Sequence, residues 1–287
     1  YFLSLYFYFN QKINIQLINS ITILFFILVF TVFFLYRIMK IGPSSILYLK
    51  DDIANKNDYR KAEIIRVVQV CLGFLFFIFH SIVFLGFFNT LLFFISSFFI
   101  SLLLEIIGAN KGYIFGKYSY EPKLCPGPLI GNVPILIALS WTGLIYMSLN
   151  YSFMIFGINF NELITLENIL LTSLLVTILD LVLDPIAVDE GRWKWQSPGK
   201  YYGIPIKNFF GWFLNTVIIL FFNELFSKEH FLNEKFEFYV TYSPGILFIL
   251  LPIIAARPCF ERKLLWAGII GVVFTFILAS LMIFRFQ

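Results

Sequence analysis

The sequence predicts an all-α fold, a polytopic membrane helix bundle of about eight transmembrane helices. Of its 287 residues, 60% are hydrophobic and only 13% are charged, against roughly 25% charged residues in a typical soluble domain. The mean hydropathy is +0.86, and 38 Phe with 15 Tyr are too many for one soluble core of this size. This composition excludes an ordinary soluble globule, a disordered tail and a nucleic-acid-binding module. Residues 1–287 are therefore expected to form a single integral membrane domain.

Eight stretches approach the roughly 20 apolar residues that a membrane-crossing helix requires. The second and third are separated only by a few residues around Gly86, which predicts a tight helical hairpin, and Pro185 is expected to end the fifth. The seventh is short and lies among Pro244, Pro252 and Pro258. The predicted spans are 15–36, 64–86, 88–107, 131–150, 164–184, 207–226, 244–256 and 264–284.

The positive residues predict the orientation of these spans. Eight spans place 17 of the 21 Lys and Arg residues on one side of the membrane and the other four on the opposite side. Since cytoplasmic loops carry an excess of Lys and Arg, the first side is predicted to be cytoplasmic, with both termini outside. We therefore expect a multi-pass protein of the cell (cytoplasmic) membrane, surrounded by the lipid bilayer. The opening residues include neither Met nor a basic segment, so no cleavable signal peptide is predicted.

Three carboxylates close predicted spans at their cytoplasmic ends, Glu105 on the third and Asp180 with Asp184 on the fifth. A charge at membrane depth costs a few kcal/mol, so all three are candidate catalytic residues. The i, i+4 spacing places Asp180 and Asp184 on one helix face, where repulsion between like charges favours a protonated form of one of them near pH 7. Alternatively, these acids lie at the membrane interface and pair with basic loop residues such as Arg192 or Lys111.

Two loops combine glycine and proline with many aromatic residues, at 108–134 and 191–212. Glycine and proline fix sharp turns, and Trp and Tyr side chains form rigid walls. An interfacial aromatic belt is the alternative, but it explains poorly why five Trp and Tyr residues lie between 193 and 212. Arg192, Lys194 and Lys200 are expected at lipid head groups. The residues expected to line a substrate pocket are Tyr118, Trp193, Trp195, Tyr201, Asn208 and Trp212.

These loops and acids resemble two signatures of the membrane-bound carotenoid biosynthesis proteins, a family that includes carotenoid 1,2-hydratases and bisanhydrobacterioruberin hydratase. The resemblance covers roughly residues 64–284. The first signature comprises Glu105, Gly108, Gly112, 115–120 (FGKYSY) and 131–134 (GNVP). The second comprises 180–185 (DLVLDP), 191–195 (GRWKW), 199–205 (GKYYGIP) and 208–212 (NFFGW).

The resemblance implies a hydratase that adds water across the terminal isoprenoid double bond of a carotenoid or related polyisoprenoid. Other enzymes of carotenoid biosynthesis are then candidate partners. Protonation of the double bond gives a tertiary carbocation, which aromatic faces stabilise and water captures. Asp184 or Asp180 is the expected general acid, with Glu105 orienting the water. Asn208 is expected to hydrogen-bond the water or a carboxylate.

Two further classes of function stay open on the sequence alone. Asp180 and Asp184 could bind a magnesium diphosphate in an intramembrane prenyltransferase, with 51–52 as the second acidic motif, and a carotenoid cyclase begins with the same protonation as a hydratase. A non-enzymatic transporter or scaffold for lipids or carotenoids would have paired interrupted helices, whereas prolines interrupt only the seventh span.

No cofactor and no metal site are predicted for the hydratase. The chain has neither a Gly-x-Gly-x-x-Gly sequence nor a P-loop, and its two histidines, His80 and His230, lie far apart. His80 is expected to be a helix-packing residue. The three cysteines show no Cys-x-x-Cys spacing, which argues against a zinc site or a disulfide framework.

Overall fold

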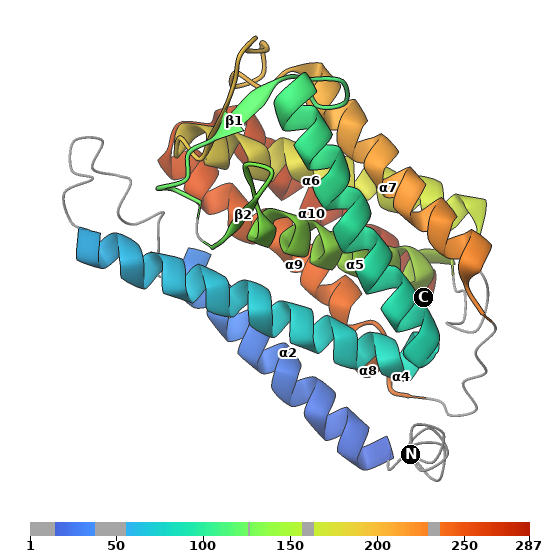
Figure 1. Cartoon of the computed structure of the whole chain (residues 1–287). Coiled ribbons are helices and arrows are strands. Elements are labelled where there is room, and N and C mark those ends of the chain that lie inside the picture. Colours follow the sequence, from blue (N-terminus) through green and yellow to red (C-terminus); the bar gives the residue numbers. More distant parts are fainter. Residues whose placement is uncertain (1–14, 38–55, 126, 157–163, 229–235) are drawn as a thin grey trace.

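The computed structural model describes residues 15–37, 56–125, 127–156, 164–228 and 236–287, and it is a helix bundle (Figure 1). The all-α fold class is confirmed. The helices are α2 (Ile15–Arg37), α4 (Lys56–Lys111), α5 (Ile135–Phe156), α6 (Leu166–Asp189), α7 (Ile206–Phe226), α8 (Phe238–Thr241), α9 (Ser243–Glu261) and α10 (Leu265–Phe286). The strands, all short, are β1 (Tyr118–Tyr120), β2 (Leu129–Ile130), β3 (Val133–Pro134) and β4 (Trp193–Trp195).

Seven helices in the described part of the chain are long and apolar enough to cross a membrane. One of them, within α4, has an apolar stretch of 46 residues, about twice the length that a crossing needs. This helix changes direction at Gly86, whose φ of 77° and ψ of 165° are not helical and suit a residue without Cβ. The predicted hairpin of spans 64–86 and 88–107 therefore corresponds to the two arms of α4 (Figure 1).

Several span boundaries differ from the predicted ones. The fourth span begins later than residue 131, because β2 and β3 pair as a small antiparallel hairpin directly before α5. The seventh span is longer than predicted, since α9 has 19 residues and continues through Pro252 and Pro258. Hydropathy locates an apolar segment but does not fix its helix ends, since a hairpin delays the start of α5 and α9 passes through two of its prolines.

The prediction that Pro185 ends the fifth span is wrong. Helix α6 continues to Asp189, so the two aspartates lie within it. Proline has no N–H and cannot donate to the carbonyl four residues earlier, which here is the carbonyl of Leu181. The Tyr201 hydroxyl donates to this carbonyl at 2.7 Å. A side chain from the second motif loop thus replaces the missing backbone bond and lets the helix continue.

Polar side chains join the helices inside the bundle. The buried His80 is a helix-packing residue, as predicted: its Nδ1 lies 2.7 Å from the Tyr146 hydroxyl, and its Nε2 lies 3.1 Å from the carbonyls of Val240 and Thr241. Such bonds between membrane helices contribute roughly 0.6–2 kcal/mol each. The second arm of α4 is joined to α7 by Asn215–Ser101 and Asn223–Ser96.

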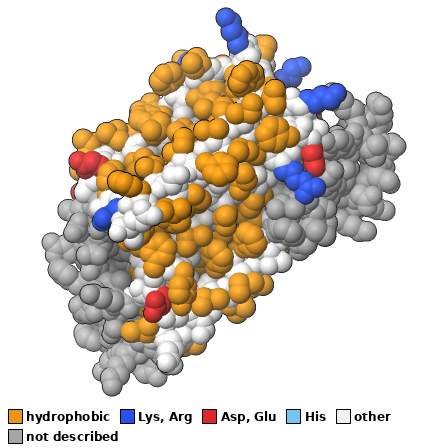
Figure 2. Space-filling model, turned by 180° about the vertical axis from the view of Figure 1, so that it is seen from behind, with side chains coloured by type: hydrophobic (Ala, Val, Ile, Leu, Met, Phe, Trp, Pro, Cys, Tyr) orange, Lys and Arg blue, Asp and Glu red, His pale blue; other side chains and the backbone are white. Residues whose placement is uncertain are grey.

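The outer surface of the bundle is apolar over a wide area. Figure 2 shows one face covered mainly by hydrophobic side chains, with several Lys and Arg side chains toward its upper edge. On α10, Phe276 is 66% exposed and Phe284 is 82% exposed, which only a lipid environment tolerates over so large an area. A membrane location follows from this surface. The identity of the membrane and the side on which the loops lie stay predictions.

The replacement of a backbone bond by Tyr201 can be tested with a double-mutant cycle. Tyr201→Phe leaves the Leu181 carbonyl without its donor, so we expect a loss of about 1–3 kcal/mol in the free energy of unfolding. In a Pro185→Ala background, the new N–H donates to that carbonyl, and Tyr201→Phe should cost clearly less. Unfolding in detergent measures both effects. Equal costs in the two backgrounds would contradict the assignment.

Candidate active site

The two motif loops meet at one end of the bundle, as the sequence predicts. Strands β1 and β4 pair antiparallel, with Tyr118 opposite Trp195 and Tyr120 opposite Trp193. The start of α7 is also joined to the end of α4. The Nζ of Lys207 donates a hydrogen bond to the backbone carbonyl of Gly112, the residue after α4, at 3.0 Å. Residues far apart in the sequence thus form one site at the ends of α4, α6 and α7.

Phe115 fixes the distance between α4 and α7. It is fully buried between Gly108 of α4 and Gly211 of α7. A Cβ atom at either glycine would lie 2.4 Å from a ring carbon of Phe115, closer than real atoms pack. Both glycines are therefore required for this close packing, and α7 is held where its first turn reaches α6.

The aspartate pair is buried and bridged by one amide. Asp180 is 2% exposed and Asp184 is 4% exposed. Asn208 of α7 donates from its Nδ2 to Oδ2 of Asp180 and to Oδ2 of Asp184, at 2.9 Å in each case. The indole Nε1 of Trp193 donates to Oδ1 of Asp184 at 2.7 Å. These donors offset part of the cost of burying two carboxyls.

Glu105 lies in a second buried polar cluster beside this pair. Its Oε2 accepts hydrogen bonds from the hydroxyls of Tyr118 and, at 2.8 Å, of Tyr120. Burial and the charge of Glu105 raise the pKa of both tyrosines well above the usual value, so both stay protonated donors. The charge of Asp184 also raises the pKa of Tyr118.

The β1–β4 ribbon connects the two carboxyl clusters. The rings of Tyr120 and Trp193 meet edge to face, with centroids 5.6 Å apart. Tyr120 donates to Glu105 and Trp193 donates to Asp184. One cross-strand ring contact and two hydrogen bonds thus join the end of α4 to the end of α6.

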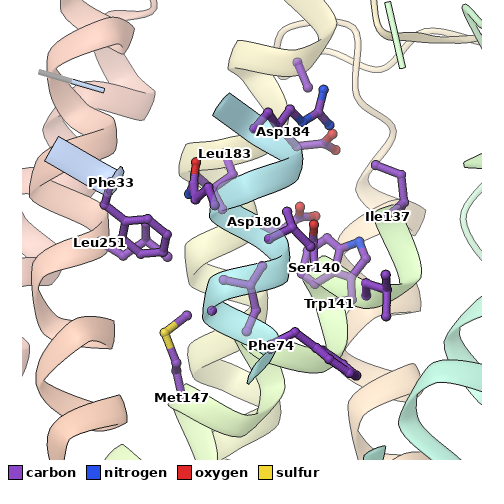
Figure 3. Close-up of a pocket in the computed structure, with 18 of the residues that line it drawn as sticks. Phe33, Phe74, Ile137, Ser140, Trp141, Met147, Asp180, Leu183, Asp184 and Leu251 are labelled. Atoms are coloured by element: carbon purple, nitrogen blue, oxygen red, sulfur yellow. The ribbon is translucent and has the colours of Figure 1, made fainter. Parts of the chain in front are cut away.

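A cavity opens beside the aspartates, between α6, α5 and the first arm of α4 (Figure 3). Its volume is about 170 Å³. Most of its lining is apolar, which suits a hydrocarbon ligand. Its polar lining residues are Arg66, Gln69, Ser140, Asp180, Asp184, Arg192 and Trp193. Apolar lining residues include Phe33, Phe74, Phe77, Leu144, Met147 and Leu251.

Most of the predicted pocket residues do not line this cavity. Among the six predicted substrate-binding residues, only Trp193 lines the cavity in the described part of the chain, and Glu105 does not line it. Trp212 stacks on Trp141, a lining residue, with ring centroids 3.4 Å apart. The others bind neighbours: Trp195 donates to the Phe115 carbonyl at 3.1 Å, Tyr118 to Glu105, Tyr201 to Leu181 and Asn208 to the aspartates.

The cavity also includes residues that sequence reasoning missed. Arg192 was expected at lipid head groups, but it is 6% exposed, forms an ion pair with Glu190 and lines the cavity. Lys194 and Lys200, for which the same position was expected, are exposed. Arg66 is buried beside the cavity. Its position at the start of an apolar span could have identified it as a candidate site residue. Trp141 and Ser140, inside an apolar span, carry no such signal.

The fold and the site together define a polytopic α-helical membrane protein with paired carboxyls beside an apolar cavity. A family described as "Carotenoid biosynthesis protein" matches residues 65–281. The chain therefore belongs to the carotenoid biosynthesis protein family.

One curated relative and the solved structures complete the comparison. The chain is 31% identical over 126 residues to the bisanhydrobacterioruberin hydratase of Haloarcula japonica. This match covers 44% of the chain and 42% of the relative, so it spans less than half of that protein. No solved structure matches the chain.

The packing of Phe115 between two glycines gives a stability prediction. Gly211→Ala places a methyl group 2.4 Å from a ring carbon of Phe115, and overpacking of this kind costs about 1–3 kcal/mol. Adding Phe115→Leu should restore part of that loss. Gly73→Ala is the control, because its Cβ would meet no atom closer than 3.7 Å. Thermal unfolding in detergent compares the variants, and a Gly211→Ala protein as stable as the wild type would contradict the prediction.

Proposed function

We propose that this protein hydrates the terminal isoprenoid double bond of a carotenoid. The observation that carries the proposal is the pair of buried carboxyls, bridged by Asn208, on the wall of an apolar cavity within a membrane bundle. Membership of the family supports a carotenoid as the substrate. The partial match to a bisanhydrobacterioruberin hydratase supports hydration as the reaction.

The chemistry of hydration explains why carboxyl groups are needed. An isolated alkene is a weak base and accepts a proton only from a well-positioned acid. A carboxyl O–H transfers its proton to the less substituted alkene carbon, and the C–H bond that forms leaves a tertiary cation on the neighbouring carbon. Water adds to this cation through oxygen and releases a proton to the carboxylate. The balance consumes one water, regenerates the acid and involves no oxidation.

The cavity provides suitable surroundings for each reactant. The indoles of Trp193 and Trp141 border it close to the aspartates, and an aromatic face stabilises a cation by roughly 0.5–2 kcal/mol. Side chains such as Phe74 and Met147 offer an apolar surface to the polyene. Gln69 and Ser140 supply polar partners of the kind that an ordered water requires. We place this site on the cytoplasmic side of the cell membrane, from the distribution of Lys and Arg.

The described residues contain no group of three or more His, Cys, Asp or Glu side chains that could bind a metal ion. The acidic pair at 51–52 lies outside the residues that the structure describes. A prenyltransferase and a cyclase are alternative outcomes of the pigment experiment.

Pigment analysis in engineered bacteria tests the proposed function. Strains that make lycopene or bisanhydrobacterioruberin would express the wild type, Asp180→Asn or Asp184→Asn. We expect the wild type to yield a more polar pigment, heavier by one water, and each variant to lose about 100-fold or more of this product. Glu167→Gln is the matched control, because Glu167 lies exposed at the opposite end of the same helix.

The other outcomes separate the rival functions. A ring-closed pigment of unchanged mass would indicate a cyclase. Turnover of a prenyl diphosphate that magnesium supports and EDTA abolishes would indicate a prenyltransferase. Unchanged pigments in both strains, with the protein present in the membrane, would overturn the proposal and favour a transporter or scaffold.

A further inference from the structure

We propose that the two aspartates have different and fixed roles: Oδ1 of Asp180 carries the catalytic proton, and Asp184 stays ionised. Trp193 is the positioning residue that enforces this difference. The inference rests on the proposed hydration for its chemical meaning. It assigns a distinct role to each member of the pair.

The hydrogen-bond donors around the pair are unequal. Both oxygens of Asp184 accept N–H groups, Oδ1 from Trp193 at 2.7 Å and Oδ2 from Asn208 at 2.9 Å. Asp180 accepts one, at Oδ2 from Asn208 at 2.9 Å. No residue in the described part of the chain donates a hydrogen bond to Oδ1 of Asp180. Asn208 donates one hydrogen bond to each carboxyl, so the difference in the number of donors comes from the indole of Trp193.

This inequality decides where a proton is held. An N–H donor stabilises a carboxylate relative to its acid, and two buried like charges on one helix face oppose double ionisation. One carboxyl must then be protonated, and the proton requires an oxygen that accepts no N–H. Among the four oxygens of the pair, only Oδ1 of Asp180 meets this condition. Asp184, with two donors, is the carboxylate.

The position of each aspartate along the cavity agrees with its role. In Figure 3, Asp180 lies between Asp184 and the apolar residues Phe74 and Met147. On the proposed roles, an isoprenoid end group enters from the side of Phe74 and Met147 and meets Asp180 first. Asp184 lies at the opposite end of this row.

The roles give a balanced cycle. Asp180 donates its Oδ1 proton to the less substituted alkene carbon and becomes a carboxylate, while the tertiary cation forms beside Asp184. The fixed negative charge of Asp184 stabilises this cation. Water then binds the cation through oxygen, and the proton that it loses returns to Oδ1 of Asp180. Asp184 neither gains nor loses a proton, and the next cycle begins from the same state.

A pH profile tests the role of Trp193. On the proposed roles, kcat falls at acidic pH when Asp184 becomes protonated, and it falls at alkaline pH when Asp180 loses its proton. These two falls are the acidic and alkaline limbs of the pH profile. Trp193→Phe removes one donor from Asp184, so the acidic limb of kcat should move to higher pH by about one unit. Trp195→Phe, which removes an indole bond to a backbone carbonyl, should leave that limb in place. Among the residues that the structure describes, the other charged groups near the pair are Arg66, Arg192 and Glu105, and they are identical in both variants.

The opposite assignment gives a different profile. If Asp184 were the acid, Trp193→Phe would move the alkaline limb and leave the acidic limb unchanged. Movement of the alkaline limb alone, or an equal shift in Trp195→Phe, would overturn the proposal.

Infrared spectroscopy tests the same roles without activity. Purified wild type at neutral pH should show the carbonyl band of a buried carboxylic acid, with a shift to lower frequency in D2O. This band should vanish in Asp180→Asn and keep its frequency in Trp193→Phe, because Trp193 donates to Asp184 and makes no bond to Asp180. A band that Asp180→Asn leaves in place, or that moves to higher frequency in Trp193→Phe because its carbonyl has lost the indole donor, would overturn the inference. The hydratase proposal would survive this result, because it depends on the pigment products and not on which aspartate is protonated.

Discussion

The contact of Asn208 with Asp180 and Asp184 is the interaction on which the rest of the site depends. Two carboxyls buried in a membrane bundle are costly, and an amide nitrogen has two N–H bonds, one for each. The contact forms only because α7 begins directly against the last turns of α6. That position depends on Phe115, which packs between Gly108 and Gly211. Helix packing and site chemistry therefore require each other.

The β1–β4 ribbon adds a second constraint at the same end of the bundle. Its cross-strand pairs bring Tyr118 and Tyr120 to Glu105, and Trp193 to Asp184. Glu105 accepts hydrogen bonds from both tyrosines of this ribbon and does not line the cavity. Among the described residues, Asp180 and Asp184 are the carboxyl groups that line it.

Much of the bundle could be predicted because lipid selects for local composition. Apolar segments long enough to cross a bilayer appear directly in the sequence, and the i, i+4 spacing of Asp180 and Asp184 places both on one face. The error at Pro185 has a non-local cause. The carbonyl that this proline leaves unpaired is bound by Tyr201, a residue from another segment. Arg192 was misplaced for a similar reason, since its burial depends on Glu190 and on the walls of the cavity.

By itself, the sequence determined the membrane bundle, its apolar segments, its three intramembrane acids and the two aromatic loops. These follow from the cost of polar groups in lipid and from helical periodicity, both of which are local. Only the tertiary structure decided which aspartate oxygen lacks a donor, which aromatic residues border the cavity and which lie behind it. Those features depend on directions of N–H groups and on packing distances between segments distant in the chain, which no spacing within one segment can specify.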